Sequence, residues 1–203
     1  MSQVAKDGFL PTLHPTADQL HRASQLPVFT ETGEQVLLGS LMRGEKGGKC
    51  IVIFCQDFIS YLTSKITPEV LQQNNIKLSI VGCGDWELIE PYRKNLGTPF
   101  EMYSDATKDT YIALGMTLRT LDMGNHNPEY QKNGMISNIF SSIVKAFKIG
   151  SIFSKNAGDQ KQLGGEFVFV NGEPIYTHRM ENTRGHAPLA ELFEAAGLPP
   201  PDQ

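Results

Sequence analysis

One continuous apolar run and a second strand-like run, separated by a helix-length segment, constrain the fold of this chain more than any other feature. Residues 50–55 and 77–82 are rich in valine and isoleucine, which is typical of strands buried on both faces of a sheet. Between them, apolar residues recur every three or four positions over 58–73, which predicts an amphipathic helix. Pro68 removes a backbone donor inside this segment, so we expect a kink or a restart with Thr67 as the cap.

The remaining segments add strands on both sides of this unit. Short strands are expected at 100–103, 166–170 and 174–177, and Asn171-Gly172 between the last two is a strong hairpin signal. A smaller hairpin is expected near the N-terminus, around the turn at 31–34. Because helical patterns alternate with the strands, we predict an α/β domain whose mixed central sheet has helices on both faces.

One long segment, residues 116–162, interrupts this alternation. Turn residues come first, and an apolar pattern of helical spacing follows over 136–147. A segment of this length between sheet strands is often a lid or a binding element; the alternative is that it only covers exposed core. The length of 203 residues fits one domain. We therefore expect a single domain over 1–203, with its core at about 28–192 and a helical insert at about 116–162.

Composition and charge exclude several classes of partner. The net charge of −4 and the isoelectric point of about 5.7 argue against nucleic acid, because nucleic-acid binders usually carry a basic excess. Residues 1–13 lack the features of a signal peptide. The most apolar stretch, 135–153, contains Lys145 and Lys148 and is too polar for a bilayer span. We expect a cytoplasmic protein with a small-molecule substrate and no membrane partner, and a homodimer stays open.

No motif in the sequence points to a cofactor. A glycine-rich nucleotide loop, a zinc spacing and a metal-binding cluster are all missing from the sequence. We therefore expect neither a cofactor nor a metal.

Several motifs, in order along the chain, resemble one family. They are Gly-Cys-Gly-Asp at 82–85, Pro-Phe at 99–100, Tyr-Ser-Asp-Ala-Thr at 103–107, Leu-Gly-Gly-Glu-Phe at 163–167 and His-Arg-Met-Glu-Asn-Thr-Arg-Gly-His at 178–186. Together they resemble the peroxiredoxin-like AhpC/TSA antioxidant proteins, particularly the fungal and animal peroxiredoxin-like 2 branch. The resemblance covers nearly the whole chain and implies a thioredoxin-like fold of the peroxiredoxin type.

The chain departs from this family where the redox site belongs. The family usually carries Cys-x-x-Cys at the start of the helix after the first central strand, preceded by an Arg-His-Phe-like tripeptide. Here Gln56 and Asp57 replace the arginine and histidine, Phe58 matches, and Ser60 and Thr63 stand where the two cysteines belong. A serine remains a neutral alcohol at pH 7 and cannot form a sulfenic acid, so the usual peroxidase cycle is not expected at these positions.

The three cysteines lie elsewhere, at positions 50, 55 and 83. We expect buried free thiols, since free cysteine is among the most buried residue types. The alternative is that Cys55, at a strand end, acts as a displaced nucleophile, and Cys83 ends the next strand. A free thiol of Cys55 or Cys83 at the mouth of the cavity, with the Ser60 hydroxyl pointing away, would contradict a non-redox interpretation.

Three polar residues near the start of this helix are the candidate catalytic groups. Asp57 places a carboxylate at the strand-to-helix turn, where it could act as general acid or base, although an aspartate before a helix is also a favoured cap. Ser60 is a nucleophile, a hydrogen-bond donor or a cap, and no Gly-x-Ser-x-Gly elbow surrounds it. Thr63 is the third candidate, with a helix-surface contact as its alternative.

A second set of residues is expected to bind substrate if the family's geometry holds. It consists of Tyr61, Gly164, Gly165, Arg184 and His186. The glycine pair permits close approach of the backbone, an arginine can bind anions or carbonyls, and a histidine can carry protons near neutrality. The alternatives are a structural hydrogen-bond network for the polar residues and a core position for the tyrosine.

Three functions remain open from the sequence. The first is a non-redox enzyme of isomerase, lyase or cyclase type that acts on a small carbonyl- or hydroxyl-rich metabolite; a fungal secondary-metabolism setting is implied only by the resemblance. The second is a non-catalytic pseudo-peroxiredoxin that binds a ligand or a protein. The third is a residual thiol peroxidase that uses Cys55.

Overall fold

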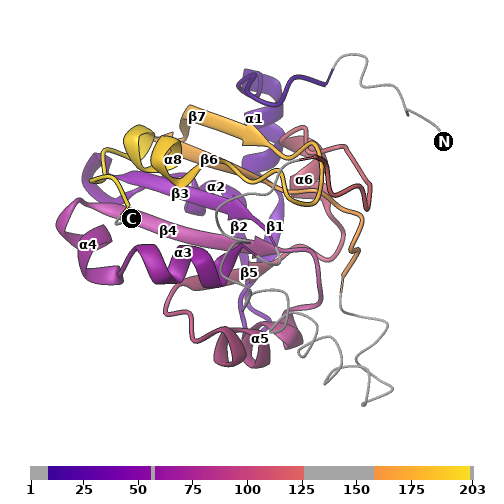
Figure 1. Cartoon of the computed structure of the whole chain (residues 1–203), viewed down its shortest axis with the longest axis horizontal. Helices are drawn as coiled ribbons and strands as arrows, with labels where there is room; N and C mark the ends of the chain where they lie inside the picture. Colours follow the sequence, from indigo (N-terminus) through magenta and orange to yellow (C-terminus); the bar gives the residue numbers. More distant parts are fainter. Residues whose placement is uncertain (1–8, 56–57, 126–157, 202–203) are drawn as a thin grey trace.

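Seven strands form one mixed sheet in the part of the chain that the computed structural model describes, residues 9–55, 58–125 and 158–201 (Figure 1). They are β1 (Pro27–Phe29), β2 (Gln35–Leu37), β3 (Lys49–Phe54), β4 (Ile76–Gly82), β5 (Glu101–Ser104), β6 (Gly165–Val170) and β7 (Glu173–Arg179). Their order across the sheet is β2-β1-β5-β4-β3-β6-β7. The strands β3, β4 and β5 run parallel, and the other pairs are antiparallel. The predicted mixed sheet is confirmed.

The central strand β3 shows why residues 50–54 are all apolar. Its side chains alternate between the two faces of the sheet, as in any strand. Ile51 and Ile53 join one buried cluster, whereas Val52 and Phe54 join the other. All four are fully buried. A strand with packed layers on both faces leaves no position for a polar side chain.

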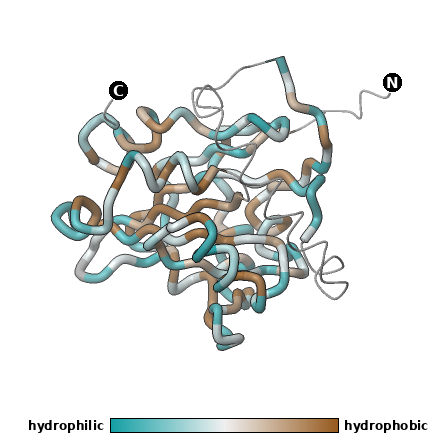
Figure 2. The backbone as a smooth tube through the Cα atoms, turned by 60° about the horizontal axis from the view of Figure 1, so that its bottom comes forward, coloured by the Kyte–Doolittle hydropathy of each residue, from teal (hydrophilic) through white to brown (hydrophobic). Residues whose placement is uncertain are grey.

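Helices supply both layers, as the sequence predicts. The first cluster receives side chains from α3 (Ile59–Lys65), α4 (Pro68–Gln73), α5 (Ile89–Leu96) and α8 (Leu189–Ala196). The second receives them from α1 (Ala17–Ser24), α2 (Leu38–Leu41) and α6 (Asp109–Ala113). Two 3₁₀ turns, η1 (Glu45–Gly47) and η2 (Trp86–Leu88), complete the described elements. Figure 2 shows the hydrophobic colours concentrated along the interior strands.

The predicted interruption of the first crossover helix is confirmed. Pro68 is the first residue of α4, a position where its missing N–H leaves no helical hydrogen bond unmade. Thr67 precedes it as the N-cap residue, but its side chain makes no capping hydrogen bond. The crossover therefore consists of the two helices α3 and α4, and α3 begins at the carboxyl end of β3.

Asp105 lies three residues upstream of Lys108, the N-cap residue of α6. Its buried carboxylate accepts hydrogen bonds from the backbone N–H groups of Lys108 and Thr110, both at 2.8 Å. The side chain satisfies donors that a helix start leaves open. Asp105 thus stabilises the first turn of α6 although it lies outside the helix.

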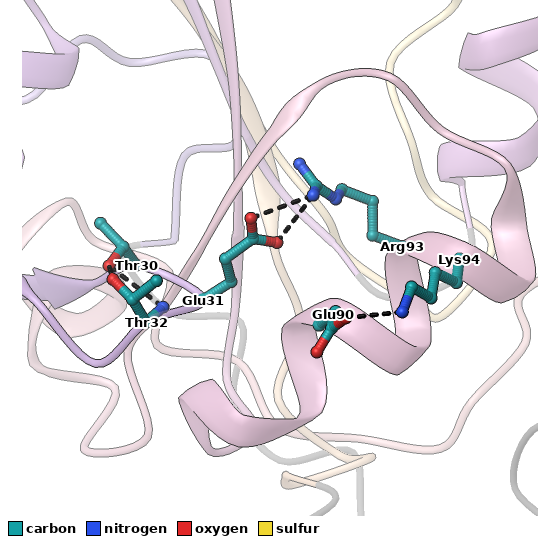
Figure 3. A network of polar contacts seen from close by, with 6 residues as sticks. All are labelled: Thr30, Glu31, Thr32, Glu90, Arg93 and Lys94. Carbon is teal, nitrogen blue, oxygen red and sulfur yellow. Dashed lines mark hydrogen bonds and ion pairs between the residues drawn. The ribbon is translucent and has the colours of Figure 1, made fainter.

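Polar contacts connect the N-terminal hairpin to α5 (Figure 3). The Nη2 atom of Arg93 lies 3.0 and 2.9 Å from the two carboxylate oxygens of Glu31, which follows β1. Along α5, the Nζ atom of Lys94 lies 2.6 Å from Oε1 of Glu90. Gly33 turns the hairpin with a φ of +78°, a conformation in which glycine carries no steric cost. The predicted hairpin is confirmed.

The segment 116–162 is described only at its ends. Residues 118–120 pair with 161–163 through backbone hydrogen bonds, including Thr120 N–H to the Lys161 carbonyl at 2.8 Å and Leu163 N–H to the Leu118 carbonyl at 3.2 Å. The apolar helix expected over 136–147 lies outside the described residues, and its role stays a prediction.

Candidate functional site

A cavity of about 180 Å³ lies at the carboxyl ends of the parallel strands β3 and β4. Residues that follow these strands, the segment before β6 and the segment after β7 all contribute to its wall. The lining residues are Phe54, Cys55, Cys83, Tyr111, Leu121, Gln160, Gln162, Leu163, Gly164, Met180, Thr183 and His186. The crevice beyond the carboxyl ends of parallel strands is where open α/β sheets usually bind ligands.

Gly164 fits the cavity wall because it has no side chain. A Cβ atom there would overlap the backbone carbonyl of Phe54, the last residue of β3. The neighbouring Gly165 begins β6, pairs with Phe54 in the sheet and closely approaches the backbone of His178. Both close approaches are to the protein's own backbone, so substrate binding at this glycine pair stays a prediction.

The one charged residue of β6, Glu166, is fully buried beside this cavity. Its Oε1 lies 2.6 Å from Nδ1 of His186, and its Oε2 lies 2.9 Å from Nδ1 of His178. The Ala187 backbone N–H donates a third hydrogen bond to Oε2 at 3.2 Å. A buried carboxylate is tolerated when it is paired and hydrogen-bonded in this way.

The two histidines determine the ionisation of Glu166. Burial alone, the largest single influence, would raise the pKa of this carboxyl. The charge of His186 and the hydrogen bonds from both histidines outweigh it and lower the pKa of Glu166 to about 2. The group is therefore an anion at neutral pH, inside an otherwise apolar wall.

Sheet register and loop geometry hold this cluster in place. Glu166 pairs directly with Ile53 of β3 and with His178 of β7. His186 comes from the segment between β7 and α8, and its ring stacks on Phe58 with centroids 4.4 Å apart and planes 13° from parallel. Phe58 lies at the start of α3. The imidazole is thus fixed by a carboxylate on one side and by an aromatic face on another.

Two thiols lie in the same wall. Cys55 directly follows β3 and Cys83 directly follows β4, and both line the cavity. All three cysteines are buried and none forms a disulfide, which agrees with the expectation of buried thiols outside any disulfide. Cys50 does not line the cavity, and burial raises the pKa of its thiol to about 11, with a small opposing effect of Lys77. Cys55 and Cys83 therefore border the cavity, whereas Cys50 does not.

The predicted catalytic residues do not gather at this cavity. Ser60 and Thr63 are half-buried on α3 and are not among the lining residues. The Thr63 hydroxyl donates to the Thr98 hydroxyl at 3.0 Å, which fits its alternative as a helix contact. Asp57 lies outside the described residues, so its role stays a prediction. With Cys55 and Cys83 in the wall and Ser60 outside it, the structure matches most of the arrangement expected above to contradict a non-redox interpretation, and it argues against a site centred on Ser60.

The predicted substrate-binding residues divide in the same way. Gly164 and His186 line the cavity, and Gly165 supports it from β6. Tyr61 packs against Phe58, with ring centroids 5.9 Å apart, and Arg184 is half-buried; neither is a lining residue. Any contact of these two side chains with substrate therefore stays a prediction.

Glu166 is the functional residue that the sequence interpretation missed. A signal was present, because a glutamate in the apolar run 165–170 interrupts a strand that is otherwise buried on both faces. A buried acid needs partners, and His186 was already a candidate. What the sequence does not contain is the β6–β7 register that places Glu166 opposite His178.

In the part of the chain that the structure describes, no group of three or more His, Cys, Asp or Glu side chains is arranged to hold a metal ion. None of the described helices is long and apolar enough to cross a membrane.

The fold and the place of this cavity define a thioredoxin-like protein of the peroxiredoxin type. Solved structures support this class at the level of fold. A cysteine-to-serine mutant of peroxiredoxin Q from Xylella fastidiosa matches with a TM-score of 0.53, 11% identity and 93% coverage of both chains. A cysteine-to-serine mutant of peroxiredoxin Q from Xanthomonas campestris matches with a TM-score of 0.50 and 11% identity, covering 78% of this chain and 83% of that one.

Sequence comparison gives the family. The family model for AhpC/TSA antioxidant enzymes matches residues 61–182, more than half of the chain, and the chain belongs to this family. Similar curated relatives are the proteins named Peroxiredoxin-like 2C. The protein from Mus musculus is 27% identical over 185 residues, covering 87% of this chain and 80% of the relative; the one from Homo sapiens is 27% identical over 183 residues, covering 86% and 79%.

Proposed function

We propose that this chain is a non-redox enzyme that moves protons on a small neutral organic molecule bound in the cavity beside His186. The reaction class is isomerisation or elimination, with enolisation of a carbonyl compound as the simplest form. The observation that carries the proposal is the imidazole of His186 in the cavity wall, held by the buried carboxylate of Glu166 at 2.6 Å. An imidazole oriented by a carboxylate is a common general base and acid.

The charge of Glu166 supports this role. Its pKa of about 2 keeps it ionised at neutral pH, so it stabilises the imidazolium that forms when His186 accepts a proton. Because Nδ1 of His186 contacts Glu166, proton exchange with a ligand would go through Nε2, the opposite ring nitrogen. Nε2 is itself buried, so the side chains around it must shift for a ligand to reach it. Fixing one nitrogen in this way determines which one performs the proton transfer.

Size and charge of the cavity define the substrate class. Its volume of about 180 Å³ is smaller than the roughly 300–1,000 Å³ of pockets for drug-sized ligands. Among the described lining residues there is no lysine or arginine, and most side chains are apolar. A small neutral molecule fits this wall better than a phosphate or a dicarboxylate. With the net charge of −4, this supports a free metabolite in the cytoplasm as the partner rather than a nucleic acid.

The placement of the cysteines supports a second candidate, a thiol peroxidase that uses Cys55. In that reaction the Cys55 thiolate attacks a peroxide oxygen, the O–O bond breaks, an alcohol leaves and a sulfenic acid forms, which an external dithiol reduces. Cys55 in the cavity wall favours it. Among the described lining residues there is no lysine or arginine, so His186 is the side chain of this wall that could supply the cation a reactive thiolate usually needs.

Solvent hydrogen exchange tests the first candidate. Cyclopentanone is incubated with the protein in D₂O, and loss of the hydrogens next to the carbonyl is followed by proton NMR. We expect protein-dependent exchange that falls about 10²–10⁴-fold in His186→Gln, the usual contribution of a general acid–base group, and that persists in Ser60→Ala. Wild-type exchange no faster than buffer alone would reject the proposal. Asp57→Asn, tested in the same assay, shows whether that carboxylate participates.

Peroxide consumption tests the second candidate. Hydrogen peroxide and tert-butyl hydroperoxide are supplied with dithiothreitol as the reductant. Consumption that disappears in Cys55→Ser would establish the thiol peroxidase in place of the proton-transfer enzyme. No protein-dependent consumption is the result that our first candidate expects.

A further inference from the structure

We infer that the cavity takes α,β-unsaturated carbonyl compounds, and that Cys55 adds reversibly to their carbon–carbon double bond while His186 moves the proton. This inference rests on the proposed function and names the substrate class of the same site. It assigns a role to a thiol that proton transfer alone does not use. Its basis is that a nucleophile and an oriented imidazole belong to one small, mostly apolar cavity.

The register of the sheet places Cys55 on the same side of the cavity as His186. Glu166 pairs with Ile53 in the antiparallel β3–β6 pair, and Cys55 lies two residues beyond Ile53, on the same face. Diagonal neighbours of this kind have side chains about 7–8 Å apart. His186 contacts Glu166, and its ring stacks on Phe58, which shares an apolar cluster with Cys55. A ligand small enough for the cavity can therefore contact both groups.

The second thiol lies on the other side. Cys83 belongs to the opposite apolar cluster, with Tyr111, and its Sγ lies 3.8 Å from the Asp159 carbonyl. Cysteines whose side chains leave a sheet toward opposite faces cannot form a disulfide without backbone movement. Both thiols line the same cavity and neither forms a disulfide, and we assign the addition to Cys55 because it lies on the face of the sheet that carries Glu166.

Addition and reversal need no oxidant or reductant. The Sγ atom of Cys55 bonds to the β-carbon of the ligand as the double bond breaks, and the thiol proton passes to His186 and then to the α-carbon. The new single bond can then rotate. His186 removes the α-proton again, the carbon–sulfur bond breaks with its electrons going to sulfur, and His186 returns the proton to Cys55, which restores the thiol and leaves the alkene in its other geometry. The net reaction is a cis–trans isomerisation, which is within the proposed isomerase class.

The rest of the wall suits such a ligand. Phe54, Leu163 and Met180 present apolar surface, which matches a conjugated hydrocarbon skeleton. Gln160, an exposed residue at the rim, carries an amide group that can donate a hydrogen bond to the ligand's carbonyl oxygen. Conjugation lets that oxygen take up the negative charge that forms during addition.

The test uses two probes and the full chain. With dimethyl maleate, proton NMR follows conversion to dimethyl fumarate; with cyclohex-2-enone, which cannot isomerise, mass spectrometry of peptides locates the covalent adduct. We expect isomerisation by the wild type that falls to the rate without protein in both Cys55→Ser and Cys55→Ala. The adduct is expected on Cys55, and its formation slows in His186→Gln.

Cys50 provides the matched control within the chain. Its thiol is fully buried in the core, away from the cavity, so Cys50→Ala should isomerise dimethyl maleate at the wild-type rate, with circular dichroism confirming the fold. Isomerisation that persists in both Cys55 variants, or adduct on Cys50 or Cys83 in place of Cys55, would overturn the inference. If cyclopentanone exchange is intact but Cys55 stays unmodified, the inference fails alone; if exchange is also absent, the proposed function fails with it.

Discussion

Two glutamates of this protein each contact nitrogen atoms through both carboxylate oxygens, in opposite surroundings. Glu31 connects the N-terminal hairpin to α5 through Arg93 at 3.0 and 2.9 Å, and both side chains keep about a third of their surface exposed. Glu166 lies between His186 and His178 at 2.6 and 2.9 Å, with no exposed surface. The contacts are of similar length, but Glu166 is fully enclosed, whereas water reaches part of the Glu31–Arg93 pair, in which Oε2 of Glu31 is itself buried.

The difference in burial between the two glutamates indicates which of them has a functional role. An exposed ion pair contributes little, because water already solvates both charges. A buried carboxylate must overcome a large desolvation penalty, and an apolar residue of similar size would often be as stable. An anion kept in the wall of a cavity therefore suggests a task beyond stability. We assign that task to the orientation of His186, and the four predictions that follow test the contrast in order of expected effect.

The largest effect is expected from Glu166→Ala. Removal of the carboxylate leaves two histidines packed around an unfilled, partly polar space, and breaking a buried pair costs about 3–5 kcal/mol of unfolding free energy. Urea denaturation measures it. Glu31→Ala is the matched control, and equal losses in the two variants would contradict the contrast.

Acid should remove the same stabilisation gradually. The pKa of Glu166 is depressed in the folded state from an ordinary 4.5 to about 2, so its contribution is fully present above pH 4.5 and is lost as the pH falls toward 2. Over this pH range the protein should lose about 3 kcal/mol of unfolding free energy. Unfolding midpoints between pH 6 and 2.5 should show this loss in the wild type, and Glu166→Gln should remove that part of the slope. If the unfolding midpoint of Glu166→Gln depended on pH as steeply as that of the wild type, groups other than Glu166 would cause the loss of stability.

A smaller effect is expected when the more exposed histidine is replaced. His178 keeps 20% of its side-chain surface, whereas His186 keeps 1%. His178→Gln can retain a hydrogen bond to Glu166 and should cost about 1–2 kcal/mol. His186→Gln also loses the stacking on Phe58 and should cost more. The reverse ranking in thermal or urea unfolding would show that His178 is the main partner.

The smallest effect is expected from Glu31→Gln. Exposed pairs are typically worth about 0.2–1 kcal/mol, and Arg93 remains solvated after the change. Urea unfolding should therefore show a loss of unfolding free energy below about 1 kcal/mol, and 0.5 M salt should reduce the difference from the wild type further. A loss of several kcal/mol would mean that this surface contact holds the hairpin in place.

The sequence predicts the sheet much better than it predicts the site. The run 50–55, the break at Pro68 and the Asn171-Gly172 turn each carry a local signal, and the structure confirms all three. In that turn both residues adopt positive φ angles, of 54° and 89°, as such a hairpin requires. Local patterns suffice here because they reflect backbone preferences and burial.

The site depends on contacts between distant residues, which no local pattern contains. Ser60 and Thr63 were chosen because they replace the family's cysteines, yet the cavity wall is formed by residues that converge only through strand register. The pairing of Ile53 with Glu166, far apart along the chain, brings the carboxylate to the end of β3. His186 and Gly164 were found because the resemblance pointed to them, and the isolated glutamate was the signal that sequence reasoning passed over.

The most direct test of the account compares one substitution at the two glutamates. Exchange of the α-hydrogens of cyclopentanone in D₂O is measured for Glu166→Gln and Glu31→Gln, with circular dichroism confirming that both are folded. The account predicts that Glu166→Gln lowers the rate by about a hundredfold or more, whereas Glu31→Gln matches the wild type. Full exchange in a folded Glu166→Gln protein would contradict it, because the buried carboxylate would then have no part in moving the proton.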